Sequence, residues 1–255
     1  MAGYVVGCCN GVVCILKQEV FFLWNPATRN STKLPKLDLQ IPPISKCGFG
    51  WDAASGAYKV FVVSSGGFGQ IYSSNTNSWR RVCMHGRRLP MKHKNAQFVC
   101  GKIHWPTHRH TESFDLNTEV FGEIEHPFDL EFGMQLWLGE IKGCLSLVCD
   151  DSDGTTLGVW IMKEYGVKES WLKVLNASLA CPQQHNGPFS AVLEIASEGV
   201  VLLIYGSAFL VCSRDDVAVL ISSPDKVSTC CKVTRRYTTH FYVESLVSPV
   251  PDANR

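Results

Sequence analysis

Three histidines stand close together in one stretch of the chain, and histidine is a common ligand of metal ions in proteins. His104, His108 and His110 occupy positions i, i+4 and i+6, a spacing that permits a metal site if the three imidazoles converge. The local pattern opposes convergence, because His104 falls in a strand-like apolar run and the other two fall in the polar segment after it. We expect one strand histidine and an exposed loop, and we keep a metal-dependent enzyme using these three residues as an alternative.

Other residues capable of chemistry carry no recognisable catalytic signature. A cysteine nucleophile needs a base that a third group orients, and none of the 12 cysteines lies in a local pattern of that kind. The glycine-rich stretch 65–69 lacks the lysine and the helix of a phosphate-binding loop, and it is typical of a hairpin turn. We therefore expect no enzyme activity, no bound metal and no cofactor.

Charge is distributed unevenly along the chain. Residues 53–111 contain nine lysines and arginines and no acid, whereas residues 112–154 contain eleven acids and one lysine. We favour an electrostatic fit between neighbouring repeat units as the explanation. The functional alternative is a basic loop, residues 83–94, that meets an acidic or phosphorylated segment of a target protein. Its candidate protein-binding residues are the cations Arg87, Arg88, Lys92 and Lys94, with Met84 and Met91 as apolar contacts.

The elements that must position these residues repeat along the chain. A strand, a polar turn and a second strand span residues 22–35, and similar hairpins follow at 71–82, 113–124, 159–174 and 209–220. Thr28, Thr76 and Thr118 occupy the same place in three of the turns, at intervals of 48 and 42 residues. Two more apolar runs precede each hairpin, so the pattern predicts five units of four antiparallel strands, the period of propeller blades.

The aromatic residues and cysteines of these runs are expected to form the core. The hairpin tryptophans Trp24, Trp79 and Trp171 are predicted to pack rather than to form a ligand cage. Most cysteines lie inside strand-like runs, and we expect them to be reduced, mostly buried thiols of an intracellular protein. The runs in question contain Cys14, Cys100, Cys149 and Cys212.

Composition restricts the function further. The chain has 255 residues, of which 45% are apolar and 18% charged, with a formal net charge of +1. This is a globular composition that can bury a sizeable core. The small net charge gives no field that would favour nucleic acid or a membrane surface, and no apolar stretch is long enough for a membrane-spanning helix. We expect neither nucleic acid nor a membrane as a partner.

The first unit carries a distinctive set of motifs. They are GCCNGVVC at 7–14, LWNPATR at 23–29 and Leu-Pro at 34–35, and further matches follow in order up to FYVESLVSP at 241–249. In these segments the chain resembles the plant F-box-associated domain of F-box/kelch-repeat proteins. The resemblance implies an all-β, kelch-like β-propeller that forms a single domain over 1–249, with a disordered tail at 250–255. The resemblance leaves open whether the unit at the N-terminus is a complete blade.

The resemblance also implies a function. Such proteins look like substrate receptors of SCF-type E3 ubiquitin ligases: the propeller domain binds a protein substrate for ubiquitination, and an F-box docks on a Skp-type adaptor and, through it, on a cullin. Only six residues precede the segment that matches the family's first motif, so we expect no F-box domain and binding of target without adaptor. A truncated, non-degrading scaffold that competes for targets is a further alternative. The expected location is intracellular, in the cytoplasm, the nucleus or both.

Overall fold

The computed structural model describes the chain in ten segments and two single residues. The described residues are 4–37, 46–64, 68–84, 96–129, 134–150, 156–178, 189–195, 201–205, 208–212 and 219–222, together with Ser245 and Pro249. Regular structure in this part of the chain is all strand except for one 3-10 turn, η1 (Lys168–Ser170). No helix among these residues is long and apolar enough to cross a membrane.

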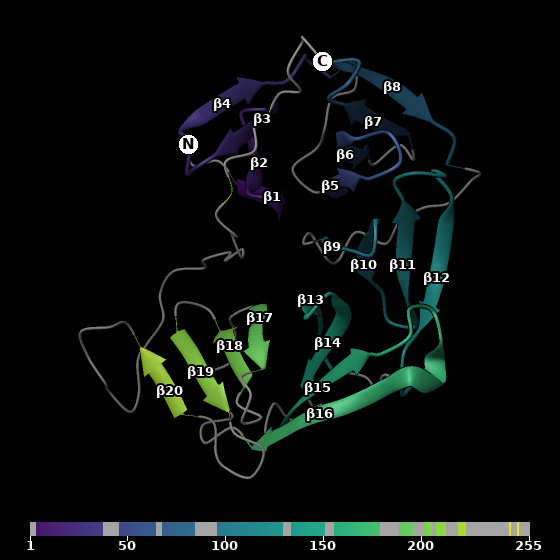
Figure 1. Cartoon of the computed structure of the whole chain (residues 1–255). Coiled ribbons are helices and arrows are strands. Elements are labelled where there is room, and N and C mark those ends of the chain that lie inside the picture. Colours follow the sequence, from purple (N-terminus) through teal and green to yellow (C-terminus); the bar gives the residue numbers. More distant parts are fainter. Residues whose placement is uncertain are drawn as a thin grey trace. The chain divides into compact units, whose positions relative to one another are not determined.

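The strands form four-stranded antiparallel sheets, each built from four consecutive strands (Figure 1). The described residues contain five such sheets. The first holds β1 (Tyr4–Cys9), β2 (Val12–Lys17), β3 (Val20–Asn25) and β4 (Asn30–Lys33), and the second β5 (Lys46–Asp52), β6 (Ala57–Val63), β7 (Gly69–Ser73) and β8 (Ser78–Val82). The third holds β9 (Gln97–Val99), β10 (Lys102–Pro106), β11 (His110–Asp115) and β12 (Phe121–Glu125). The fourth holds β13 (Leu136–Ile141), β14 (Cys144–Asp150), β15 (Thr156–Met162) and β16 (Trp171–Ser178), and the fifth β17 (Phe189–Ile195), β18 (Val201–Tyr205), β19 (Ala208–Cys212) and β20 (Val219–Ser222). The prediction of four-stranded antiparallel units is confirmed.

The chain divides into two compact units. The first comprises Met1–Thr107, Thr111–Glu123 and Tyr242–Arg255, and it contains the first two sheets and most of the third. The second comprises His108–His110 and Ile124–Phe241 and contains the fourth and fifth sheets. Within the first unit the opening strands β1, β5 and β9 contact one another, and within the second unit β13 contacts β17. Opening strands of successive sheets meet in this way in propeller folds.

The central strand β6 is buried along its whole length because both faces of the second sheet contact another sheet. Val60 and Val62 belong to a core cluster shared with the first sheet, whereas Phe61 and Val63 belong to a cluster shared with the third. Phe61 stacks on Phe114 of β11 with ring centroids 4.1 Å apart. Since successive strand residues point to opposite faces, a sheet covered on both faces needs the continuous apolar run that this strand has.

The hairpin turns repeat their backbone conformation as well as their sequence. The residue after each of the three equivalent threonines has positive φ: 59° at Arg29, 46° at Asn77 and 58° at Glu119. In two of these turns the first residue, Asn25 or Asp115, accepts a backbone hydrogen bond through its side chain. Its Oδ1 atom accepts the N–H of the residue two positions later, at 2.9 Å in both turns. The predicted equivalence of these turns is confirmed, and the cause is local Asn/Asp chemistry.

Two of the burial predictions are wrong. Cys100 is exposed, at a turn where its φ is 50°, although Cys14 and Cys149 are buried as expected. The side chain of Cys212 lies outside the described residues. Trp24 is 38% exposed, because it faces outward from β3 rather than into the core.

The other two hairpin tryptophans pack as predicted. Trp79 and Trp171 are half-buried, and each packs against a core cluster. Their indole N–H groups donate to backbone carbonyls: Trp79 Nε1 to Pro35 at 2.8 Å and Trp171 Nε1 to Glu125 at 3.0 Å.

Candidate functional site

The basic loop predicted from the sequence lies mostly outside the described residues. Arg87, Arg88, Met91, Lys92 and Lys94 all fall in residues 85–95, which the structure does not describe. Their assignment as a protein-binding site therefore stays a prediction.

The remaining member of the predicted set, Met84, is a core residue. It is 6% exposed and belongs to the cluster between the second and third sheets. Its Sδ atom would lie 2.8 Å from a Cβ added to Gly69 on β7, so the thioether occupies the space that a side chain at this position would fill. Because Met84 is buried, it is not available as an apolar contact for a target.

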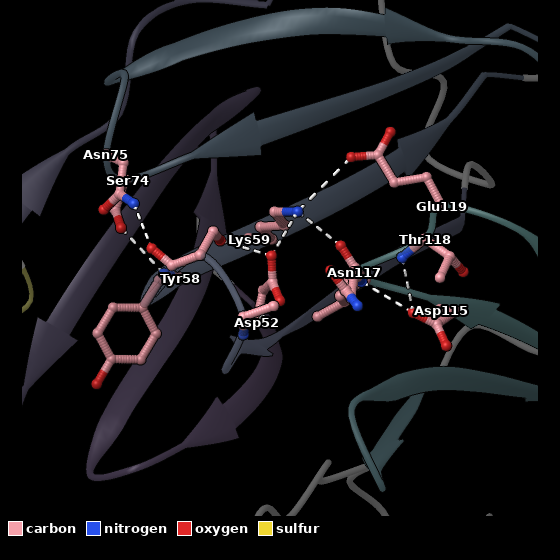
Figure 2. Close-up of polar contacts among 12 residues, drawn as sticks. Asp52, Tyr58, Lys59, Ser74, Asn75, Asp115, Asn117, Thr118 and Glu119 are labelled. Atoms are coloured by element: carbon pink, nitrogen blue, oxygen red, sulfur yellow. Dashed lines mark hydrogen bonds and ion pairs between the residues drawn. The ribbon is translucent and has the colours of Figure 1, made fainter.

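Lys59 is the centre of a buried polar network that joins the second sheet to the third (Figure 2). Its Nζ donates to the Leu116 carbonyl at 2.6 Å and lies 2.8 Å from Asp52 Oδ2 and 3.6 Å from Glu119 Oε1. Arg80 of β8 also pairs with Glu119. The electrostatic fit between neighbouring units, which we favoured from the sequence, is therefore present at this junction.

Two carboxylates at this junction, those of Asp52 and Asp115, have pKa values below the usual range. Burial opposes ionisation of Asp52, but hydrogen bonds from Lys59 Nζ and Ser55 Oγ outweigh it and keep the pKa of the Asp52 carboxyl below its usual value. For Asp115, burial likewise opposes ionisation, and the backbone N–H groups of Thr118 and Asn117 keep its pKa low. Asp52 and Asp115 therefore have structural roles. The sequence feature that indicates these roles is the Asx turn that each residue begins, rather than a catalytic motif.

A second tertiary contact uses the most recognisable motif of the chain. The Asn25 side chain is fully buried, and its Nδ2 donates to the Ser245 carbonyl at 2.7 Å. A Cβ added to Gly11, whose φ is 73°, would lie 2.3 Å from the Cβ of the same serine. Asn25 and Gly11 together therefore hold a residue near the C-terminus against the first sheet, a role that local sequence patterns do not reveal.

The candidate metal ligand His104 has a strand role instead. Its side chain is fully buried, and its Nδ1 lies 3.1 Å from the Gln97 carbonyl of the neighbouring strand β9. Burial lowers the pKa of His104 to about 4, so the ring is neutral near pH 7 and the Nδ1 proton serves this hydrogen bond. His108 is exposed and His110 is half-buried at the start of β11. The predicted strand histidine is confirmed, and nothing about His104 favours a metal. The prediction that His110 lies in the loop is wrong, because this residue begins β11.

The exposed charges of the first two sheets are mostly positive. Among the described residues 4–37, 46–64 and 68–84, Glu19 is the one exposed acid. Six lysines and arginines are exposed in the same segments: Lys17, Arg29, Lys33, Lys36, Arg80 and Arg81. The arrangement can attract an acidic ligand, and it offers no nucleophile or general base.

Comparison with known proteins identifies the domain. Residues 3–249 match the family described as F-box associated beta propeller domain. The F-box/kelch-repeat protein At3g23880 of Arabidopsis thaliana is 29% identical over 68% of this chain and 52% of its own length. The F-box protein At3g07870 of the same plant is 30% identical over 81% of this chain and 62% of its own length. The chain thus spans between about half and three fifths of the length of these curated relatives.

A solved structure supports the fold alone. The SapL1 lectin, determined in complex with alpha methyl fucoside, aligns over 89% of this chain and 82% of its own chain with a TM-score of 0.54 and 11% sequence identity. At that identity the similarity carries no information about ligands. The match over nearly the whole length decides the classification: this chain belongs to the F-box associated beta propeller domain family.

Proposed function

We propose that this chain is the target-recognition module of an SCF-type E3 ubiquitin ligase, binding a protein substrate for ubiquitination without itself catalysing a reaction. The family match over residues 3–249 carries the proposal, and the relatives that cover most of this chain are F-box proteins. In such an assembly an F-box contacts the Skp-type adaptor and, through it, the cullin.

The same proposal extends to the architecture and the location. The four-stranded meanders correspond to kelch-like blades of one propeller, with the five sheets as its repeats. An intracellular location, cytoplasmic or nuclear, suits the buried thiols of Cys14 and Cys47, whose pKa values are raised by burial. A thiol in an apolar environment stays protonated and unreactive.

The target is held, in this proposal, by the cations of the basic loop 83–94. Arg87, Arg88 and Lys92 recognise an acidic or phosphorylated segment through charge-assisted hydrogen bonds, and Lys94 and Met91 extend the contact. Two observations support this choice. The loop follows directly on β8, whose Arg80 and Arg81 are exposed, and the described residues of the first two sheets have a single exposed acid.

Affinity capture tests both levels of the proposal. The tagged chain is joined to an F-box and incubated in plant extract with the proteasome blocked, and the captured proteins are identified by mass spectrometry. We expect Arg87→Glu/Arg88→Glu/Lys92→Glu to abolish capture of the target, whereas Lys142→Glu/Lys163→Glu retains it, because both lysines are exposed in the other unit. Unchanged capture by the loop variant overturns the site, and a captured protein that is never ubiquitinated overturns the function.

A further inference from the structure

The outermost strand of the second sheet has no partner strand at its outer edge within the described part of the chain. β8 (Ser78–Val82) comes last in the order of its sheet, and within the described residues its backbone pairs only with β7. In an antiparallel edge strand, alternate residues direct their N–H and C=O groups away from the sheet. This edge can therefore accept the backbone of another extended chain.

The side chains of β8 face two different neighbours. Trp79 faces the first sheet, where its ring packs near Phe21 with centroids 5.4 Å apart. Arg80 faces the third sheet and pairs with Glu119. Because side chains alternate along a strand, Arg81 lies on the same face as Trp79, so this cation borders the edge on the side of the first sheet.

A further cation lies next to that side of β8. The hydrogen bond from Trp79 Nε1 to the Pro35 carbonyl brings the strand against the segment that follows β4. Lys36 follows Pro35 in the sequence and is exposed. Neither Lys36 nor Arg81 forms an ion pair within the described residues.

The charge of this edge differs in sign from that of the outer strand in the next sheet. β12 carries Glu123 and Glu125 at its solvent side, whereas β8 carries Arg80 and Arg81. Charged side chains on edge strands deter indiscriminate pairing between sheets. A positive edge, however, repels only basic strands and attracts acidic ones.

We propose that the outer edge of β8 receives an extended acidic segment of a protein target, which adds to the second sheet as a further strand. Main-chain hydrogen bonds to β8 supply affinity, and acidic side chains of the segment meet Arg81 and Lys36, as in strand-addition recognition. This inference rests on the proposed function, and it names the way in which the target is held beside the basic loop that follows β8.

A peptide-binding measurement on the purified full chain tests the edge directly. The probe is a fluorescein-labelled peptide in which glutamate alternates with threonine and valine, followed by fluorescence anisotropy. We expect Lys36→Glu/Arg81→Glu to weaken binding roughly tenfold, as expected for the loss of a few exposed charge pairs. Lys142→Glu/Lys163→Glu should bind as the unmodified chain does, and circular dichroism shows that each variant is folded.

Backbone pairing is tested with two further forms of the probe. N-methyl groups are added to alternate amides of the peptide, in one phase or in the other. Strand addition predicts that one phase abolishes binding and the other leaves it unchanged, because only alternate N–H groups face β8. Equal binding of all three peptides, an unaffected charge variant, or equally tight binding of a single-stranded oligothymidylate each overturns the inference.

These outcomes are separable from those of the capture experiment. The edge inference is overturned if peptide binding is the same for both phases of N-methylation. If target capture still depends on Arg87, Arg88 and Lys92, the proposed function is unaffected by that result. Phase-dependent peptide binding, combined with no captured target, supports the edge inference and contradicts the proposed function.

Discussion

Asn25 illustrates how one side chain serves local and tertiary structure at once. Its Oδ1 accepts the backbone N–H groups of Ala27 and Thr28 at 2.9 and 3.3 Å, which fixes the turn. Its Nδ2 donates to the Ser245 carbonyl. Asp115, at the same place in the third sheet, makes the same kind of turn bonds, to Asn117 and Thr118, but its other oxygen pairs with Lys102 at 3.3 Å. An amide, not a carboxylate, is therefore required in the first sheet.

The substitution Asn25→Asp separates the two roles. It keeps the turn acceptor but replaces the donor to Ser245 by an oxygen that repels the carbonyl. A buried acceptor left without its partner costs about 1–3 kcal/mol, so we expect a loss of that size in the free energy of unfolding, measured by urea denaturation. Asp115→Asn is the matched control and should change stability by about 1 kcal/mol or less, since Asn also forms this turn and the ion pair that it loses with Lys102 is partly exposed. Equal stability of Asn25→Asp and the unmodified chain would show that the Ser245 contact contributes nothing.

Burial at the residue scale could be predicted from the sequence only in part. Apolar alternation identifies the inner strands, but it does not say which face of an outer strand or of a strand end meets another sheet. Trp24 therefore points to solvent although its type predicts packing, and Met84, beyond the end of β8, returns to the core although its neighbours predict a loop. Both outcomes depend on tertiary contacts, which local patterns do not encode.

At the scale of elements, the junction between β6 and the third sheet combines apolar packing with a buried ion pair. Lys59 lies on the same face of β6 as Phe61, so its ammonium group is buried on the face where the aromatic rings pack. Asp52, at the end of β5, both caps the turn through the Ala54 N–H at 3.1 Å and meets this ammonium. The pair connects a turn of the second sheet to the Leu116 carbonyl of the third.

A double-mutant cycle measures this connection. Lys59→Met leaves the Asp52 carboxylate buried without its cation, and we expect a loss of about 3–5 kcal/mol. Asp52→Asn/Lys59→Met should lose less than the sum of the two single substitutions, because the double variant leaves no uncompensated charge. Additive losses would show that the two groups do not interact.

The same pair has a defined dependence on pH. The pKa of Asp52 is lower in the folded chain than in the unfolded one, so its stabilising contribution is complete above the unfolded value of about 4. As the pH falls through the folded pKa, that contribution disappears. The stability difference between the unmodified chain and Asp52→Asn should therefore shrink only below about pH 4, whereas the exposed Asp129→Asn should show no such change.

Element order and turn positions were accessible from the sequence, because they depend on local chemistry. The repeated threonine turns and the four-strand units follow from turn residues and period-2 runs, which act over a few positions. The contact between Gly11 and Ser245 was not accessible, since it joins residues far apart in the chain. The basic loop was predicted from composition alone, and residues 85–95 lie outside the described part of the structure.

At the scale of the whole molecule, each compact unit contains a buried histidine that resists protonation. His104 lies in the first unit and His126 in the second, and they are 0% and 3% exposed. Burial lowers the pKa of each to about 4, with the nearby His110 also lowering that of His126. Their unfolded values are about 6.5, so between about pH 6.5 and 4 the unfolded chain binds protons that the folded chain does not.

Acid should therefore weaken both units well before their carboxylates titrate. Each buried histidine removes about 1.4 kcal/mol of stability per pH unit between about pH 6.5 and 4. We expect the melting temperature to fall over this range, and His104→Asn to flatten the fall, because an amide can still donate to the Gln97 carbonyl but takes up no proton. His108→Gln, at an exposed position, should leave the slope unchanged. An equal slope in His104→Asn and the unmodified chain would contradict the lowered pKa of His104, because the ring would then take up a proton in the folded chain as readily as in the unfolded one.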